Sequence, residues 1–146
     1  MSKTYSFLDT HCAITGPGGA FPVTNGAAKE GITVAMREDK NRLEIGADGS
    51  GIHSLRADNS GMITMRFLKN SPTNALLSAM YNLQKTSSVL WGINTIVIVS
   101  SVGDAITATG VAFKKQPGVT YSEDAAVLEW EFEAIYIDEL LAASIA

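Results

Sequence analysis

The sequence contains few of the residues that form disulfides, metal sites and catalytic centres. A single cysteine, Cys12, rules out a disulfide within the chain, and only two histidines, His11 and His53, are present. No CxxC or HExxH spacing occurs, so the common zinc motifs are absent. His11 and Cys12 are neighbours on a predicted strand, where successive side chains point to opposite faces. We therefore expect a small buried thiol, no cofactor, no metal and no enzymatic activity.

Charge and long apolar runs are also scarce. Charged residues make up 18% of the chain, below the usual quarter for soluble domains, and the net charge is −4. The only adjacent basic pair is Lys114-Lys115, which argues against tight binding of nucleic acid. No apolar stretch is long enough to cross a bilayer, and the N-terminus lacks the pattern of a signal peptide. We expect a soluble protein made in the cytoplasm, without membrane insertion.

What the sequence does contain is β structure. Its 146 residues suit one domain, residues 1–146, and 46% of them are hydrophobic. Turn signals recur about every ten residues and separate alternating segments. We predict a mainly β fold, an antiparallel barrel or sandwich. The clearest strands are expected at Gly31–Arg37, Gly61–Lys69, Asn94–Ser100, Asp104–Phe113 and Val127–Asp138.

One flanking helix is predicted over about residues 72–85. Ser71 can cap it and Pro72 suits its first turn. Its main apolar stripe is expected to face the core, while Leu77 and Tyr81 lie beside that stripe. This arc is wider than one sheet face needs, so either the helix sits in a groove of its own domain or a second subunit covers Leu77 and Tyr81. The expected inward stripe is Ala75, Leu76, Ala79, Met80 and Leu83.

The segment from about residue 38 to 59 changes in composition. It begins with a dense run of charge and continues into a glycine-rich stretch, which predicts a long hairpin or loop projecting from the domain. The polar residues singled out in it are Glu38, Asp39, Lys40, Asn41, Arg42 and Asp48.

A ladder of carboxylates marks the last strand. Glu129, Glu131 and Glu133 alternate with Leu128, Trp130 and Phe132, so the acids should share the face opposite the core. Paired carboxylates can act as acid and base, but that chemistry needs a cleft and unequal environments. Three equivalent carboxylates on one strand more simply mark a solvated face.

Several segments together resemble a family of phage structural proteins, the tail tube proteins of contractile-tailed bacteriophages. The similarity spans nearly the whole chain in order. It is carried by Glu30–Met36, Glu38–Asn41, Ile45–Gly49, Phe67–Ala75, Leu90–Gly92, Val111–Pro117 and Glu129–Phe132.

This resemblance implies a fold related to pyocin and type VI secretion tubes (the Hcp fold). Six-membered rings would stack into a hollow tube inside a sheath and conduct the genome into the host. The implied partners are further copies of the chain and the sheath, baseplate and terminator proteins. The implied location is the virion, after assembly in the host cytoplasm, and DNA would pass through the lumen without specific binding.

In such a tube Leu77 and Tyr81 would contact a neighbouring subunit, and the 38–59 segment would contact the next ring. The ladder Glu129, Glu131 and Glu133 would line the lumen or, alternatively, face the sheath. Two other functions stay open at this point: a monomeric β-barrel that binds a small ligand, and a tube subunit of a secretion system.

Overall fold

The computed structural model describes residues 5–23, 27–100, 102–124 and 126–141 of the chain. Within them lie nine strands, one α-helix and one short 3-10 helix, η1 (Phe7–Asp9). The mainly β prediction with a single flanking helix is confirmed. The elements are β1 (Thr10–Gly16), β2 (Gly19–Pro22), β3 (Ala27–Met36), β4 (Asn41–Ile45), β5 (Gly51–Leu55), β6 (Gly61–Leu68), α1 (Pro72–Gln84), β7 (Asn94–Ser100), β8 (Ala105–Lys115) and β9 (Val127–Leu140).

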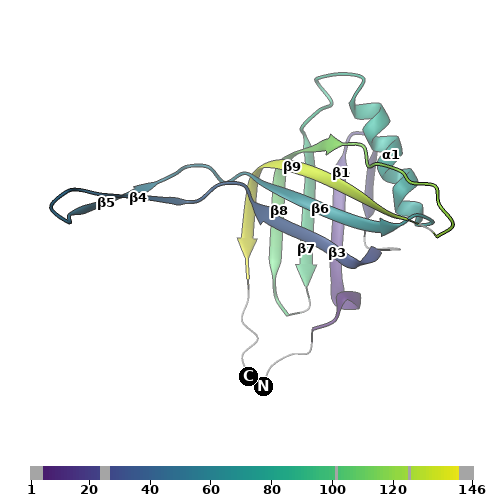
Figure 1. Ribbon diagram of the computed structural model, residues 1–146. Helices are drawn as coiled ribbons and strands as arrows, with labels where there is room; N and C mark the ends of the chain where they lie inside the picture. The colour runs from purple at the N-terminus through teal and green to yellow at the C-terminus, as the bar shows by residue number, and fades with distance from the viewer. Residues whose placement is uncertain (1–4, 24–26, 101, 125, 142–146) are drawn as a thin grey trace.

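Seven strands form one antiparallel sheet in the order β2-β1-β7-β8-β9-β6-β3. The long strand β9 joins its two halves: residues 127–134 pair with β6, and residues 131–140 pair with β8. The sheet therefore folds around β9, with β3 and β6 crossing in front of β1, β7 and β8 (Figure 1). Over the described residues the sheet does not close, and β2 and β3 are its free edges.

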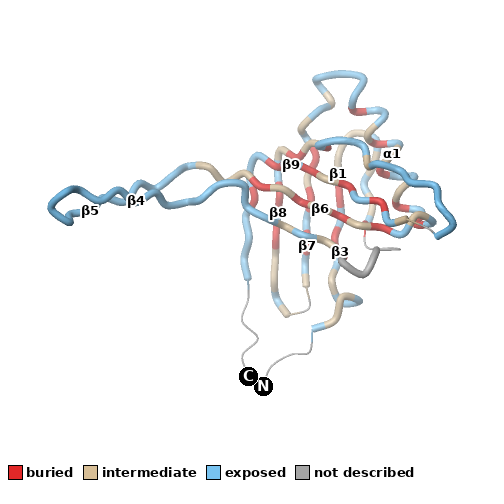
Figure 2. The backbone as a smooth tube through the Cα atoms, in the orientation of Figure 1, coloured by how far each residue is buried: buried red, intermediate tan, exposed pale blue. Residues whose placement is uncertain are grey.

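The core lies between the two halves of this folded sheet. Every second residue of β6, from Gly61 to Phe67, is buried, and β9 shows the same alternation from Leu128 to Ala134. Their registers place Met65 opposite Trp130. Phe113 of β8 packs against Trp130 with ring centroids 5.9 Å apart. Such fully buried side chains each contribute about 1.5–3 kcal/mol to folding, and Figure 2 shows the buried positions concentrated in this region.

The helix α1 begins as predicted but is rotated relative to the expected orientation. The Ser71 hydroxyl accepts a hydrogen bond from the backbone N–H of Thr73, and Pro72 occupies the first turn. Its buried residues are Thr73, Leu77, Met80 and Gln84, spaced four, three and four apart. The expectation that Leu76 and Leu83 face inward is wrong: they are 46% and 43% exposed.

A buried polar residue causes this rotation. Gln84 is 0% exposed and exchanges two hydrogen bonds with Asn94 of β7, at 2.7 and 2.8 Å. Gln84 Nε2 also donates to the carbonyl of Pro17, and Asn94 Nδ2 donates to that of Val111. Because both amides are satisfied, a polar residue can occupy the buried face of the helix. A hydrophobic pattern alone cannot reveal this.

The predicted projecting segment is a two-stranded hairpin of β4 and β5, which extends well away from the domain (Figure 1). All ten residues of the two strands are exposed. At its tip Asp48 accepts hydrogen bonds from the backbone N–H and hydroxyl of Ser50, at 3.1 and 2.6 Å. Gly49 there adopts φ +88°, a left-handed conformation that glycine accommodates without strain.

Candidate functional site

The carboxylates of β9 lie on the sheet face opposite the core, as the alternation predicted. Leu128, Trp130 and Phe132 are buried on the inner side. On the outer side the register sets Arg66 opposite Glu129, Thr64 opposite Glu131 and Met62 opposite Glu133. The ladder therefore lies on the same surface as outward side chains of β6 and β8. The net charge of this surface depends on those side chains as well as on the three carboxylates.

Two cations of neighbouring strands neutralise most of this ladder. Arg66 Nε lies 3.2 Å from Glu129, and its Nη1 donates to Thr33 on β3. Lys114 Nζ lies 3.8 Å from Glu131 Oε2, an oxygen shielded from solvent that accepts no hydrogen bond from the described residues. Glu133 has no ion-pair partner among those residues. The three carboxylates and these two cations together carry a net charge of −1 per subunit. The register also sets Lys115 opposite Glu131, so the face as a whole is closer to neutral.

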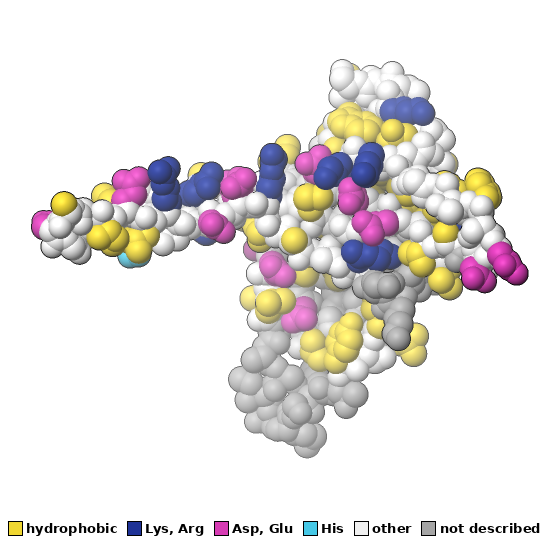
Figure 3. Space-filling model, in the orientation of Figure 1, with side chains coloured by type: hydrophobic (Ala, Val, Ile, Leu, Met, Phe, Trp, Pro, Cys, Tyr) yellow, Lys and Arg dark blue, Asp and Glu magenta, His cyan; other side chains and the backbone are white. Residues whose placement is uncertain are grey.

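On the face of the body shown in Figure 3, the acidic and basic side chains of the described residues are interspersed, without a large patch of one sign. This surface does not present the basic stripe that grips phosphates.

Cys12 is buried, as expected, and its surroundings make it unreactive. Removal from water raises the pKa of its thiol to about 12. His11 and Cys12 pair with consecutive residues of β7, Val99 and Ile98. Across the described ranges, no group of three or more His, Cys, Asp or Glu side chains could hold a metal ion. No helix in the described part is long and apolar enough to cross a membrane.

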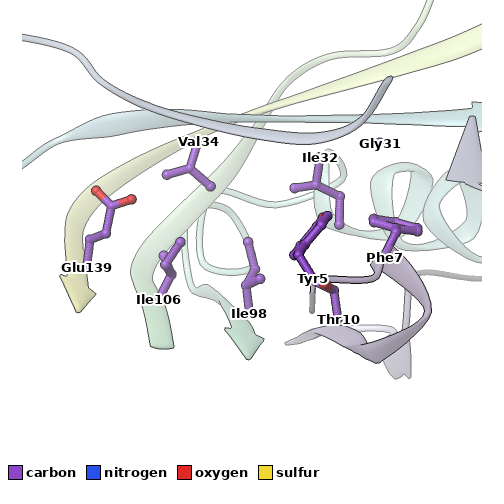
Figure 4. Close-up of a pocket in the computed structure, with 9 residues that line it drawn as sticks. All are labelled: Tyr5, Phe7, Thr10, Gly31, Ile32, Val34, Ile98, Ile106 and Glu139. Carbon is purple, nitrogen blue, oxygen red and sulfur yellow. The ribbon is translucent and has the colours of Figure 1, made fainter. Parts of the chain in front are cut away.

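A cavity of about 410 Å³ lies between β3 and the ends of β7, β8 and β9 (Figure 4). Its walls are mostly apolar, and its polar groups include the hydroxyl of Thr10 and the carboxylate of Glu139. Thr10 Oγ1 is buried without a hydrogen-bond partner among the described residues. The size would admit a small ligand, but the described residues of the lining include no thiol, histidine or second carboxylate for catalysis. The apolar walls are Phe7, Ile32, Val34, Ile98 and Ile106.

A second hollow, of about 590 Å³, lies at the base of the hairpin. Glu133 lines it from β9, together with Arg37 and Asp58 from the hairpin base and Trp91 from the loop after α1. Its floor includes Gly110 and Ala112. The one carboxylate of the ladder without an ion pair among the described residues therefore lies beside this groove, which Arg37 also lines.

The residues expected between neighbouring subunits lie in different environments. Leu77 is 0% exposed in its own core, so the expectation that a second subunit covers it is wrong. Tyr81 is half-buried and packs edge-on against Trp91 and Phe113, with centroids 6.1 and 5.6 Å apart. The large aliphatic side chains that α1 presents to the outside are Leu76 and Leu83. They were missed because the buried Gln84 shifts the helix face.

The polar residues selected in the projecting segment mostly hold the hairpin together. Lys40 Nζ donates to Asn59 Oδ1 at 2.7 Å, and Asn41 Nδ2 lies 3.1 Å from His53 Nδ1. Glu38 and Arg42 are in exposed ion pairs with Arg56 and Glu44, at 3.6 and 3.3 Å. Hydrogen bonds from the Ser50 side chain and backbone lower the pKa of Asp48. Asp39 is exposed.

The hairpin also has exposed apolar residues that were not among the predicted contact residues. Leu43, Ile45, Ile52 and Leu55 are 52%, 63%, 64% and 83% exposed. The alternation of Leu43 and Ile45 was the available signal in the sequence.

Comparison with known proteins links this architecture to tubes. A family model described as bacteriophage PhiTE tail tube protein matches residues 1–142. No curated protein sequence matches the chain.

Solved structures with similar folds come from contractile particles. A chain from the anti-feeding prophage baseplate, 13% identical, has a TM-score of 0.62 and covers 96% of this chain and 97% of its own. A chain from the sheath-tube complex of an extracellular contractile injection system, 11% identical, has a TM-score of 0.60, with coverages of 94% and 91%. A chain from the tube-terminating cap of the anti-feeding prophage, 12% identical, has a TM-score of 0.57, with coverages of 97% and 94%. At these identities the likeness concerns the fold.

Proposed function

The chain belongs to the bacteriophage PhiTE tail tube protein family, and we propose that its subunits form six-membered rings that stack into a hollow tube conducting the phage genome. Membership makes it a structural component of a phage or phage-like particle, which argues against an enzyme. The observation that carries the proposal is the match over residues 1–142. It is supported by an antiparallel sheet whose edges β2 and β3 have no further strand paired to them among the described residues. Free edges invite pairing with further strands, and a closed ring of subunits would remove them.

The proposed partners follow from the same assignment. Copies of the chain would contact one another within and between rings, and sheath, baseplate and terminator proteins would contact the assembled tube. Similar folds occur in sheath-tube and cap assemblies of contractile particles. Assembly would take place in the host cytoplasm. The exposed Leu76 and Leu83 of α1, with the half-buried Tyr81, would lie at a subunit border.

In this proposal the face of Glu129, Glu131 and Glu133 lines the lumen. Six subunits would bring eighteen of these carboxylates to each ring, and Arg66 and Lys114 would pair twelve of them. The ladder and its two paired cations would then carry −6 per ring, and Lys115 opposite Glu131 would reduce this charge. A wall so close to neutral would not hold DNA phosphates, so that the genome slides without binding. At physiological salt the Debye length is about 8 Å, so only charges near the passing phosphates matter.

The lumen assignment is tested best at Glu133, because it makes no ion pair within the part of the chain that the structure describes. Glu133→Lys in a complemented phage should leave tubes intact on micrographs but slow genome delivery, most strongly at low salt. Glu123→Lys is the matched control, since Glu123 is an exposed acid in the loop before β9. Equal infectivity of both variants and wild type would place the ladder on the outer wall.

A second candidate is a tube subunit of an injection particle that carries no genome. It is favoured by the fold likeness to an extracellular contractile injection system. Particles purified from the native source would separate the two, because a phage tail joins a DNA-filled head and an injection particle has none.

The assembly itself can be tested on purified protein. Size-exclusion chromatography with light scattering should give particles of six subunits or more, and negative-stain microscopy should show rings or tubes. A protein that stays monomeric at high concentration, in the presence of preformed tube ends, would contradict the proposal.

A further inference from the structure

A row of paired residues crosses the sheet from the core to the wall of the 410 Å³ cavity. Cys12 of β1 pairs with Ile98 of β7, and Ile98 pairs with Ile106 of β8. Ile106 in turn pairs with Glu139 of β9. Residues directly opposite each other in an antiparallel pair share a face. The row therefore begins with a buried thiol, continues through two buried isoleucines and ends on a carboxylate on the same face.

The opposite wall of the cavity is also well defined. Gly31 on β3 adopts φ +64°, and a Cβ atom there would lie 3.3 Å from the ring of Phe7. Glycine accommodates both this backbone conformation and the close approach of the ring. Ile32 and Val34, further along β3, pack against the core. The cavity thus lies between packed apolar walls, and its volume falls within the range of small-molecule sites.

Glu139 determines the charge of this cavity. The described residues of the lining include no lysine, arginine or histidine, and Glu139 makes no ion pair with any described residue. Figure 4 shows Glu139 at one end, Phe7 and Thr10 at the other, and Ile98 and Ile106 between them. The hydroxyl oxygen of Thr10 is shielded from solvent, so the accessible charge lies at the Glu139 end. One carboxylate repels anions and is too few ligands for a calcium ion, but it attracts an organic cation.

We propose that this cavity binds a small aliphatic amine, whose ammonium group donates to the Glu139 carboxylate while its chain lies against Ile98 and Ile106. Neighbouring strands lie about 4.8 Å apart, so β7 and β9 are about 10 Å apart across β8. A chain of about six carbons with its ammonium group spans this distance. Burial of the chain supplies most of the affinity, and the exposed carboxylate selects the sign of the charge. The site belongs to a single subunit and does not depend on the proposed tube function.

NMR titration of unassembled, isotope-labelled subunits with n-hexylamine tests the site. The methyl signals of Ile98 and Ile106 should shift, with a Kd on the order of 1 mM. Hexan-1-ol should bind about three- to fivefold more weakly, and hexanoate more weakly still, because Glu139 repels it. Glu139→Gln should remove the preference for the amine over the alcohol. Asp138→Asn is the matched control and should keep this preference, because Asp138 is the neighbouring exposed acid and points to the other face of β9.

A second pair of variants tests the location. Val34→Trp should fill the cavity and weaken the binding of both hexylamine and hexan-1-ol by at least about tenfold. Ala35→Trp, on the other face of β3, should leave both affinities within about twofold. Far-UV circular dichroism checks the fold, and Val34→Phe replaces Val34→Trp if that variant does not fold.

Three results would overturn the inference. Methyl signals that stay unshifted in about 10 mM hexylamine would show that the cavity binds no such amine. Equal affinity of the wild type for amine and alcohol, or a preference that survives Glu139→Gln, would refute the assigned ligand class. Undiminished binding by the folded Val34 variant would place the ligand elsewhere.

Discussion

Replacing Asn94 by alanine should destabilise the folded subunit by about 2–6 kcal/mol. The side chain is 0% exposed and makes hydrogen bonds to Gln84 and to the carbonyl of Val111. Its removal leaves two buried acceptors, Gln84 Oε1 and the Val111 carbonyl oxygen, without these partners. Each unsatisfied buried group costs about 1–3 kcal/mol, which gives the total for two. Gln84 Nε2 keeps its bond to Pro17 but loses the acceptor of its second N–H, which puts the expected loss toward the upper end of this range.

Equilibrium unfolding in urea, followed by circular dichroism on unassembled subunits, measures this cost. Domains of this size have about 5–15 kcal/mol of stability, so the shift would be large. Asn41→Ala is the control, because that exposed amide lies on the hairpin, and its effect should stay within about 0.5 kcal/mol. A loss below about 1 kcal/mol for Asn94→Ala would refute the claim that the amide pair fixes α1 on the sheet.

Two further predictions concern the core and the helix. Cys12 should resist alkylation until the protein unfolds, and alkylation of the native protein at pH 8 would contradict its burial. The free energy of unfolding should also fall as the pH rises above about 9. The reason is that the thiol of the unfolded chain then loses its proton, while the buried thiol, with a pKa of about 12, retains it. Leu77→Ala should cost about 2–5 kcal/mol in thermal or urea unfolding, because it empties a core position. Leu76→Ala should change the free energy of unfolding by no more than about 0.5 kcal/mol but should weaken ring formation measured by sedimentation. If instead Leu76→Ala destabilises the subunit and Leu77→Ala does not, the helix has the orientation that the sequence predicted.

Local patterns in the sequence predicted the local structure well. The alternation around Trp130 placed Glu129, Glu131 and Glu133 on one face of β9, and Ser71 with Pro72 fixed the start of α1. The charged and glycine-rich composition after residue 38 indicated the projecting segment. Each of these features depends on neighbours within a few residues, so a short window contains the necessary information.

Features set by distant partners could not be predicted in the same way. The inward orientation of Leu77 depends on Gln84 meeting Asn94 on another strand. The partial neutralisation of the ladder depends on registers that bring Arg66 and Lys114 beside it. The sheet folds around β9 because β9 pairs with β6 on one side and with β8 on the other, along stretches that overlap. Periodicity shows which residues are buried on a strand but not which strand lies next to it.

Electron cryomicroscopy of the purified, assembled protein would show whether the chain is a tube subunit. We expect stacked rings of six subunits around an open channel, with the β9 face and Glu133 on the channel wall. Monomers, closed dimers or particles without a channel would contradict the assignment as a tube subunit.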